Sequence, residues 1–233
     1  MRESVTEERF RTGAYAVAEN WALAAEFSND SSGRHCFRVG KIVSAIALSL
    51  GISPESCLEM EFACRLHDIG KIVIDEKIGQ RQRIYDDDGH GSLTDHTTAG
   101  ARLLGCSSDP ILKIASGVAR HHHEWWNGCG YPDGLRGEAI PLEARICAIA
   151  NAYDEFVYPG FTHSAWSRKQ AVEQVCAMAG VQLDPNLVPS FLKAVRMDAA
   201  TSERVADEVD RSMERNQLAR AKKKLFETLE LVD

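Results

Sequence analysis

A histidine and an aspartate stand side by side at His67 and Asp68, and three consecutive histidines at residues 121–123 precede Glu124 further along the chain. An imidazole nitrogen together with a carboxylate, which can bridge two cations, gives the mixed ligands that many transition metals favour. An ionised aspartate that follows an apolar stretch also needs a compensating charge if it is buried. The pattern therefore predicts a metal site to which both clusters contribute.

The elements that must position these residues are predicted to be helices. Apolar residues recur at helical spacing in three segments, residues 39–50, 111–118 and 146–153, as in amphipathic helices that pack around one core. No segment alternates convincingly between apolar and polar residues. The sequence therefore predicts an all-α bundle.

Helix starts are marked by capping residues. Ser53-Pro54, Asp109-Pro110 and Asp184-Pro185 each place a capping side chain before a proline suited to a first helical turn, and residues 167–170 form a predicted capping box. The segment from Thr12 to Phe27 is also predicted to be helical.

Two segments break the helical pattern and are predicted to be loops. Residues 78–92 contain three consecutive aspartates among glycines, and residues 127–141 are rich in glycine and proline. Because the first follows His67 and Asp68 and the second follows the histidine cluster, we expect both loops to border the site.

Charge and cysteine content narrow the class of protein. The net charge of -7 over 233 residues predicts no general attraction to polymeric nucleic acid. Seven scattered cysteines without a Cys-x-x-Cys pair indicate free thiols in a cytoplasmic protein rather than a disulfide framework or a zinc ribbon. The acidic N-terminus is unlike a signal peptide, and no apolar stretch reaches the roughly 20 residues that a membrane span needs.

Several motifs in the same order resemble one known family. His67-Asp68-Ile69-Gly70-Lys71 and residues 122–132, which contain His122-His123 and Gly130-Tyr131-Pro132, are similar to the HD-GYP family of HD-domain metal-dependent phosphohydrolases. Further matches lie at residues 35–39, 96–100, 134–138, 140–146 and 183–185. The resemblance implies an HD-domain helical bundle.

The matching motifs also suggest how the chain is organised. The HD-GYP domain is expected over residues 34–198, with an N-terminal helical extension at residues 1–33 and a C-terminal helix at residues 199–233. The last segment carries a sparse apolar stripe among charged residues. Such a stripe fits a helix packed on its own domain as well as a homodimer formed through the terminal helices.

The resemblance implies two divalent metal ions, iron or manganese. His35, His67 and Asp68 would hold the first ion, and Asp68 would bridge to a second ion. The second ion would be held by the remaining three histidines, His96, His122 and His123.

The same resemblance implies hydrolysis of cyclic di-GMP to linear pGpG or GMP. A hydroxide shared by the two metal ions would attack phosphorus. Asp68 would hold that hydroxide, Lys71 would stabilise the phosphate or the leaving oxygen, and Tyr131 and Arg145 would contact the substrate.

The first metal site departs from the family pattern at Asn151, where the family has an aspartate ligand. An amide oxygen is a neutral and weaker donor, so the first site is expected to bind its ion weakly. Asp154 lies three residues further along a helix, too displaced to take over without rearrangement. Ser31 stands where some members carry a further carboxylate, so no third metal ion is expected. Asn127 also replaces a usual acid.

These departures leave alternatives to the cyclic di-GMP phosphodiesterase open. One is a catalytically impaired signalling or binding module, and another is a phosphohydrolase for a different nucleotide, since a fold does not fix a substrate. The remaining histidines, His121, His90 and His163, are not expected to be ligands, because isolated histidines usually serve other purposes.

Overall fold

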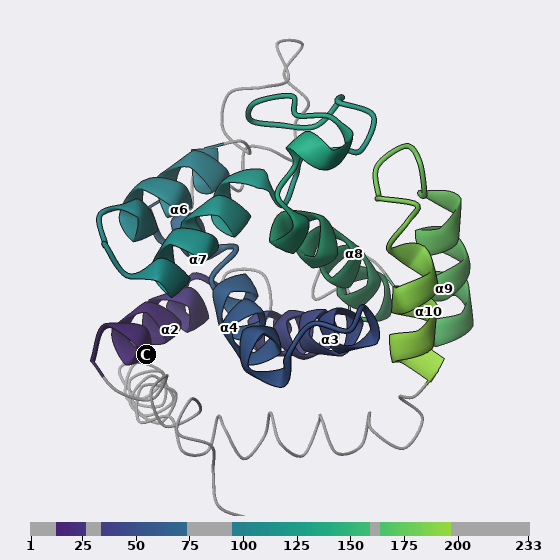
Figure 1. Cartoon of the computed structure of the whole chain (residues 1–233), viewed down its shortest axis with the longest axis horizontal. Coiled ribbons are helices and arrows are strands. Elements are labelled where there is room, and N and C mark those ends of the chain that lie inside the picture. Colours follow the sequence, from purple (N-terminus) through teal and green to yellow (C-terminus); the bar gives the residue numbers. More distant parts are fainter. Residues whose placement is uncertain (1–12, 27–33, 74–94, 159–163, 197–233) are drawn as a thin grey trace, which may run out of the picture. The chain divides into compact units, whose positions relative to one another are not determined.

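A computed structural model describes residues 13–26, 34–73, 95–158 and 164–196 of the chain. These residues form helices and turns, with one isolated β-bridge between Ala179 and Leu183 and no strand among them, so the predicted all-α fold is confirmed (Figure 1). The elements are α2 (Gly13–Glu26), α3 (His35–Ser49), α4 (Pro54–Arg65), η1 (Ile69–Val73), α6 (Asp95–Gly105), α7 (Pro110–His121), η2 (Gly137–Ala139), α8 (Leu142–Val157), α9 (Arg168–Ala177) and α10 (Val188–Arg196).

Three of the four predicted helix starts are confirmed. Ser53 accepts a hydrogen bond from the backbone N–H of Ser56, and Asp109 accepts from those of Ile111 and Leu112. Ser167 closes the capping box at the start of α9. The predicted start at Asp184-Pro185 is wrong, because α10 begins only at Val188.

The physical reason lies in the carboxylate of Asp184. One of its oxygens accepts from the backbone N–H of Asn186, which closes a turn rather than the first turn of a helix. The other oxygen is held by Arg145 of α8 at 2.7 Å. Asp184 therefore ties a turn to α8.

The buried apolar side chains form two clusters, with α4 and α7 between them. One cluster joins these helices to α3, α8, α9 and α10, and includes Val43 and Ile149. The other joins them to α2 and η1, and includes Tyr15 and Ile69. Since α4 and α7 contribute to both clusters, the residues at their C-terminal ends lie where the two parts of the core meet.

Helix α2 is attached to this core by polar contacts as well. Its Tyr15 hydroxyl donates to Asp109 at 2.5 Å, and the ring of Tyr15 meets Phe62 edge to face. Glu19, one turn further along, pairs with Arg65 at the end of α4 at 2.8 Å. The predicted helix over residues 12–27 is thus confirmed for its described part, and it belongs to the bundle.

Other expectations fall on residues outside those that the structure describes: the loop at residues 78–92, His90, His163, Ser31 and the C-terminal helix. The domain boundaries at residues 34–198 and 199–233 stay a prediction. All seven cysteines are free thiols, as expected. None of the described helices combines the length and the apolar character that crossing a membrane requires.

Candidate metal centre

The residues of the predicted site lie at helix ends that meet in the core. His67 and Asp68 follow the last turn of α4, and His122 and His123 follow α7. His96 is placed by a close approach of backbones, because a Cβ atom at Gly70 would lie 1.9 Å from the carbonyl oxygen of His96. A glycine two residues after Asp68 therefore allows α6 to bring its histidine to the site.

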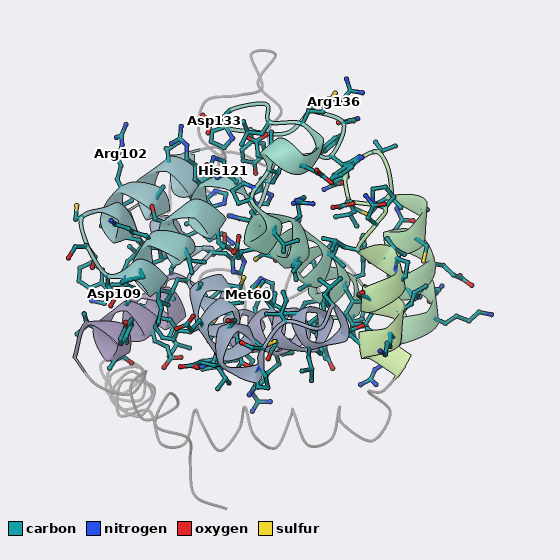
Figure 2. All side chains as sticks on the ribbon, viewed as in Figure 1. Met60, Arg102, Asp109, His121, Asp133 and Arg136 are labelled. Carbon is teal, nitrogen blue, oxygen red and sulfur yellow. The ribbon has the colours of Figure 1, made fainter. Side chains whose placement is uncertain are left out.

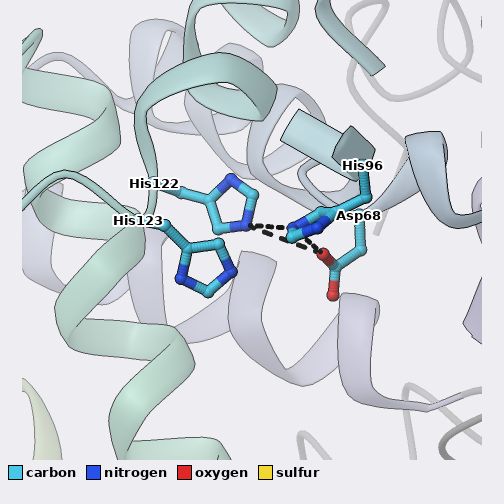
Figure 3. A group of neighbouring side chains, drawn as sticks. All are labelled: Asp68, His96, His122 and His123. Atoms are coloured by element: carbon cyan, nitrogen blue, oxygen red, sulfur yellow. Dashed lines mark hydrogen bonds and ion pairs between the residues drawn. The ribbon is translucent and has the colours of Figure 1, made fainter. Parts of the chain in front are cut away.

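Asp68, His96, His122 and His123 form one group of potential ligands (Figure 3). The Oδ1 atom of Asp68 lies 3.3 Å from His96 Nε2 and 3.6 Å from His122 Nε2, and these two nitrogens are 3.4 Å apart. Ligand atoms from all four residues lie within 4.8 Å of one another. We call this group the second cluster, and it can hold one cation.

A first cluster consists of Glu26, His35, His67 and Asp68, whose ligand atoms also lie within 4.8 Å of one another. His67 Nε2 is 3.2 Å from Asp68 Oδ2, the oxygen that does not face His96. Each carboxylate oxygen of Asp68 thus faces a different cluster. The structure brings together all six predicted histidine and aspartate ligands and adds Glu26, which the sequence analysis did not identify.

Hydrogen bonds orient three of the imidazoles. The Nδ1 atoms of His67 and His122 lie 2.8 Å from the carbonyl oxygen of Cys64 and 3.0 Å from that of Ala119, which they reach as donors. His35 Nδ1 lies 2.8 Å from Asp154 Oδ2. A partner on one ring nitrogen fixes the tautomer and leaves the other nitrogen for a metal ion.

The two clusters differ in their electrostatics. Burial lowers the pKa of His122 to about 4, despite the opposing effect of Asp68. Burial and the neighbouring His122 also lower the pKa of His123 well below its ordinary value. At His35, by contrast, Glu26 and Asp154 outweigh burial and raise the pKa to about 9. His122 and His123 therefore offer neutral imidazoles to the second cluster, whereas the first cluster attracts positive charge.

Lys71 supplies a positive charge next to the shared aspartate. Its ammonium pairs with Asp68 Oδ2. Burial works against both charges, but the pair and its neighbours outweigh it, so the pKa of Asp68 lies well below its ordinary value and that of Lys71 lies above its own. Asp68 is therefore ionised, as a bridging ligand must be.

Unpaired buried atoms support a cation at this place. Glu26 Oε1, His67 Nε2, Asp68 Oδ1 and Asn151 Oδ1 are all buried and have no hydrogen-bond partner in the described part of the chain. Buried polar atoms normally have hydrogen-bond partners. A group of buried oxygen and nitrogen atoms whose lone pairs have none can be satisfied by a bound cation. The residues present therefore fit a divalent metal centre.

Comparison with known proteins agrees with this geometry, since residues 21–187 match the family described as HD domain. The chain belongs to the HD-domain family. It is 34% identical over 179 residues to a cyclic di-GMP phosphodiesterase of Thermotoga maritima, which covers 77% of this chain and 49% of that protein. It is 33% identical over 172 residues to the cyclic di-GMP phosphodiesterase response regulator RpfG of Xanthomonas campestris, which covers 74% and 46%. The chain thus spans about half the length of these relatives, and the HD-GYP resemblance is confirmed.

A solved structure shows the same fold. A cyclic GMP-AMP-specific phosphodiesterase of Vibrio cholerae superposes with a TM-score of 0.61 at 22% identity, covering 81% of this chain and 53% of that one. The HD domain of a Listeria monocytogenes phosphodiesterase in complex with cyclic di-AMP has a TM-score of 0.54 at 15% identity and covers 77% and 96%. At these identities the likeness establishes the fold alone.

Within this HD domain, the Gly-Tyr-Pro loop packs directly on the second cluster. The ring of Tyr131 stacks on His123 with centroids 4.9 Å apart, and its backbone N–H donates to the His123 carbonyl oxygen. Gly128 has a φ of +84°, and a Cβ atom at Gly130 would lie 2.2 Å from the backbone nitrogen of Trp125. The loop therefore borders the site as predicted, and its glycines allow the tight path.

Three side chains whose function the sequence did not reveal hold this loop in the HD domain. Buried Glu124 accepts hydrogen bonds from the backbone N–H groups of Asp133 and Leu135, at 2.7 and 3.0 Å. His121 lies outside both clusters, and its Nε2 atom is 3.0 Å from the carboxylate of Asp133. Both residues are labelled in Figure 2. Arg120 pairs with the same carboxylate. The acid after the histidine run is thus an anchor for the loop.

Arg145 has structural partners in the HD domain. Its Nε donates to the carbonyl oxygen of Ile140, and one terminal nitrogen pairs with Asp184. Both acid and base lie in motifs that matched the family, and their opposite charges were a signal that the sequence analysis did not use. The described contacts attach Arg145 to Asp184 rather than to the histidine clusters, and its substrate role stays a prediction.

Asn151 lies on α8 with 6% of its surface exposed. Its amide nitrogen donates to Glu155 at 3.3 Å. Asp154 does not replace the missing aspartate, because its oxygens are occupied by His35 and Arg38. The expectation that Asp154 is displaced from the ligand position agrees with these contacts.

Proposed function

We propose that this HD domain hydrolyses a phosphodiester bond of cyclic di-GMP, giving linear pGpG or GMP. The observation that carries the proposal is Asp68, whose two oxygens face two separate sets of ligands. Relatives that match three quarters of the chain are named cyclic di-GMP phosphodiesterases. A two-metal site with a shared carboxylate suits an in-line displacement at phosphorus.

The proposed cofactor is a pair of divalent ions, iron or manganese, since mixed imidazole and carboxylate ligands suit both. Bound ions would supply Lewis acidity toward the phosphoryl oxygens and a nucleophile near neutral pH. Asp68 would bridge the pair, His35 and His67 would hold one ion, and His96 with residues 122–123 would hold the other.

The remaining roles fall to side chains next to the shared carboxylate. The Lys71 ammonium pairs with Asp68 Oδ2, where it would neutralise charge on the phosphate and donate a hydrogen bond to the leaving oxygen. The neutral phenol of Tyr131, stacked on His123, would contact the nucleotide. Arg145 would act on the substrate only by leaving Asp184.

A second candidate function is a binding or signalling module without turnover. The observation that favours it is Asn151, a neutral amide where the family has a carboxylate ligand. A third is hydrolysis of another nucleotide, because relatives from Vibrio cholerae are named 3'3'-cGAMP-specific phosphodiesterases.

The proposal also includes a cytoplasmic location, which the free thiols support. It further includes a homodimer through the terminal helices, which the apolar stripe in residues 199–233 supports.

The test is to purify the chain without oxygen, load it separately with ferrous iron or Mn²⁺, and incubate it with cyclic di-GMP, 3'3'-cGAMP or cyclic di-AMP. Products are followed by chromatography beside an Asp68→Ala control. Linear dinucleotide or GMP that is absent in the control supports the proposal. Intact substrate at full metal content would contradict it and favour the binding module, whereas turnover of another cyclic dinucleotide alone would favour the third candidate.

A further inference from the structure

We infer that Glu26 is a ligand of the first metal ion and supplies the carboxylate that Asn151 lacks. The inference rests on the metal centre of the proposed function but not on its substrate. Glu26 is the last residue of α2 and lies nine positions before His35, outside every motif that matched the family. It was found only because the fold brings α2 to the site.

The position of Glu26 on its helix explains why it faces inward. It follows Ala22 and Leu23 by four and three residues, and all three side chains are buried on one face of α2. Only 1% of the Glu26 surface is exposed. Such burial of a carboxylate is costly unless a cation or hydrogen bonds compensate it.

Two cations on neighbouring segments pair with other carboxylates. Lys71 contacts Asp68, and Arg65 contacts both Glu61 and Glu19. Glu26 Oε1 has no hydrogen-bond partner in the described residues. An unpaired buried carboxylate oxygen, aimed at two imidazoles and a second carboxylate, is what a metal ligand looks like before its ion is added.

Charge and size both suit this ligand set. In the family pattern the first ion meets two carboxylates, and here Glu26 and Asp68 restore that number although Asn151 is neutral. Two donors about 2.1 Å from one ion lie at most about 4.2 Å apart. The ligand atoms of the first cluster lie within 4.8 Å of one another. Binding therefore requires them to close by well under an ångström.

The test compares metal binding by four variants of the full chain with the wild type. Glu26→Gln removes the carboxylate charge at nearly constant shape, and Asn151→Asp restores the family ligand. The double variant carries both changes. Glu19→Gln is the matched control, because it lies two turns earlier on α2 and breaks the ion pair with Arg65 without touching the cluster.

Each protein is stripped with chelator and titrated with Mn²⁺. The metal-to-protein ratio is measured by mass spectrometry, and magnetic coupling between the ions by electron paramagnetic resonance. We expect two coupled ions in the wild type and in Glu19→Gln, and a single uncoupled ion in Glu26→Gln, with affinity for the first ion reduced tenfold or more. The double variant should regain the coupled pair.

Thermal unfolding of the stripped proteins separates ligand loss from misfolding. Without metal, Glu26→Gln should still unfold in one cooperative transition, because glutamine keeps the shape of the side chain at the same buried position. The inference is overturned if Glu26→Gln keeps two coupled ions, if Glu19→Gln loses one as well, or if the wild type binds fewer than two. A wild type that binds two ions yet leaves cyclic di-GMP intact would contradict the proposed function alone.

Discussion

The two halves of the metal centre are built differently although they share Asp68. The second cluster takes one imidazole from α6 and two from the residues directly after α7, and a short connection joins these helices. The first takes two imidazoles and the Glu26 carboxylate, and it depends on α2 and α3. The imidazoles of the second cluster therefore come from neighbouring helices and match the family pattern, whereas the first cluster is assembled from distant segments and has a second carboxylate. The departures of this chain from the family's ligands concentrate in the first cluster.

The strongest way to abolish this difference is to remove the residue that both halves share. Asp68→Ala should lose both ions and all phosphodiesterase activity, a decrease of more than about a hundredfold, because even groups that only support a ligand are worth 10–100-fold. Metal content and product formation are measured together. Retention of two ions by this variant would show that Asp68 does not bridge.

A substitution at Asp154, which contacts the ligand His35, should weaken metal binding in the first cluster alone. Asp154→Asn keeps an acceptor for His35 but removes the charge that pairs with Arg38, so we expect the affinity of the first ion to fall about 10–100-fold. The second ion should bind as in the wild type. Titration with Mn²⁺ measures both, with Glu173→Gln in the exposed pair with Lys169 as the control. An equal loss at both sites would contradict the separation of the halves.

On the other half, the loop can be loosened without touching a ligand. Glu124→Gln replaces one of the two oxygens that accept from Asp133 and Leu135, which should cost about 1–3 kcal/mol of stability. We expect cyclic di-GMP to bind several-fold more weakly while two ions remain. Glu138→Gln, exposed in the same loop, should change neither quantity. Loss of the second ion from Glu124→Gln would mean that the loop holds His123 as well as Tyr131.

The smallest expected effect is a pH dependence of stability that comes from Glu61 of α4. Burial works to raise the pKa of Glu61, but Arg65 and Lys41 outweigh it and lower the pKa below its ordinary value of 4.5. The ionised carboxylate therefore stabilises the fold fully above pH 4.5, and this contribution is lost as the pH falls through the lowered pKa.

Urea unfolding of chelated protein between pH 3 and 7 measures this contribution. Glu61→Gln should cost about 1–2 kcal/mol at neutral pH, less than a fully broken buried pair because Glu19 still holds Arg65. It should also flatten the decline of stability below pH 4.5. The exposed Glu55→Gln on the same helix should leave the curve unchanged. An undiminished acid decline in Glu61→Gln would assign that decline to other carboxylates.

What the sequence revealed follows the same division. Adjacent His67 with Asp68 and the run of histidines at residues 121–123 predicted a metal site from their spacing, whereas the assignment of His96, His122 and His123 to one ion came from the resemblance to the HD-GYP family. Glu26 could not, because its role depends on where α2 packs. One signal was present: a single acid on the apolar face of a helix, in register with Ala22 and Leu23.

Other contacts between distant segments escaped the sequence analysis for the same reason. The start of α10 was predicted too early, since Asp184 has all the features of a cap and only the fold gives its second oxygen to Arg145. Asp154 was predicted to be too displaced to replace the missing ligand without rearrangement, but its contact with His35 could not be foreseen, because it depends on the packing of α3 against α8. Helix starts fixed by neighbouring residues were predictable, and pairings across the bundle were not.

The spread of the ligands along the chain has a consequence for how the domain holds together. All seven cysteines are free, so no disulfide links the described helices. Ions bound by residues from Glu26 to His123 would act as reversible cross-links between segments nearly a hundred positions apart. If only the native state binds the metal, free metal at a hundred times the dissociation constant raises the free energy of unfolding by about 2.7 kcal/mol. The thermodynamic stability of the bundle would then depend on the concentration of free metal in the cell.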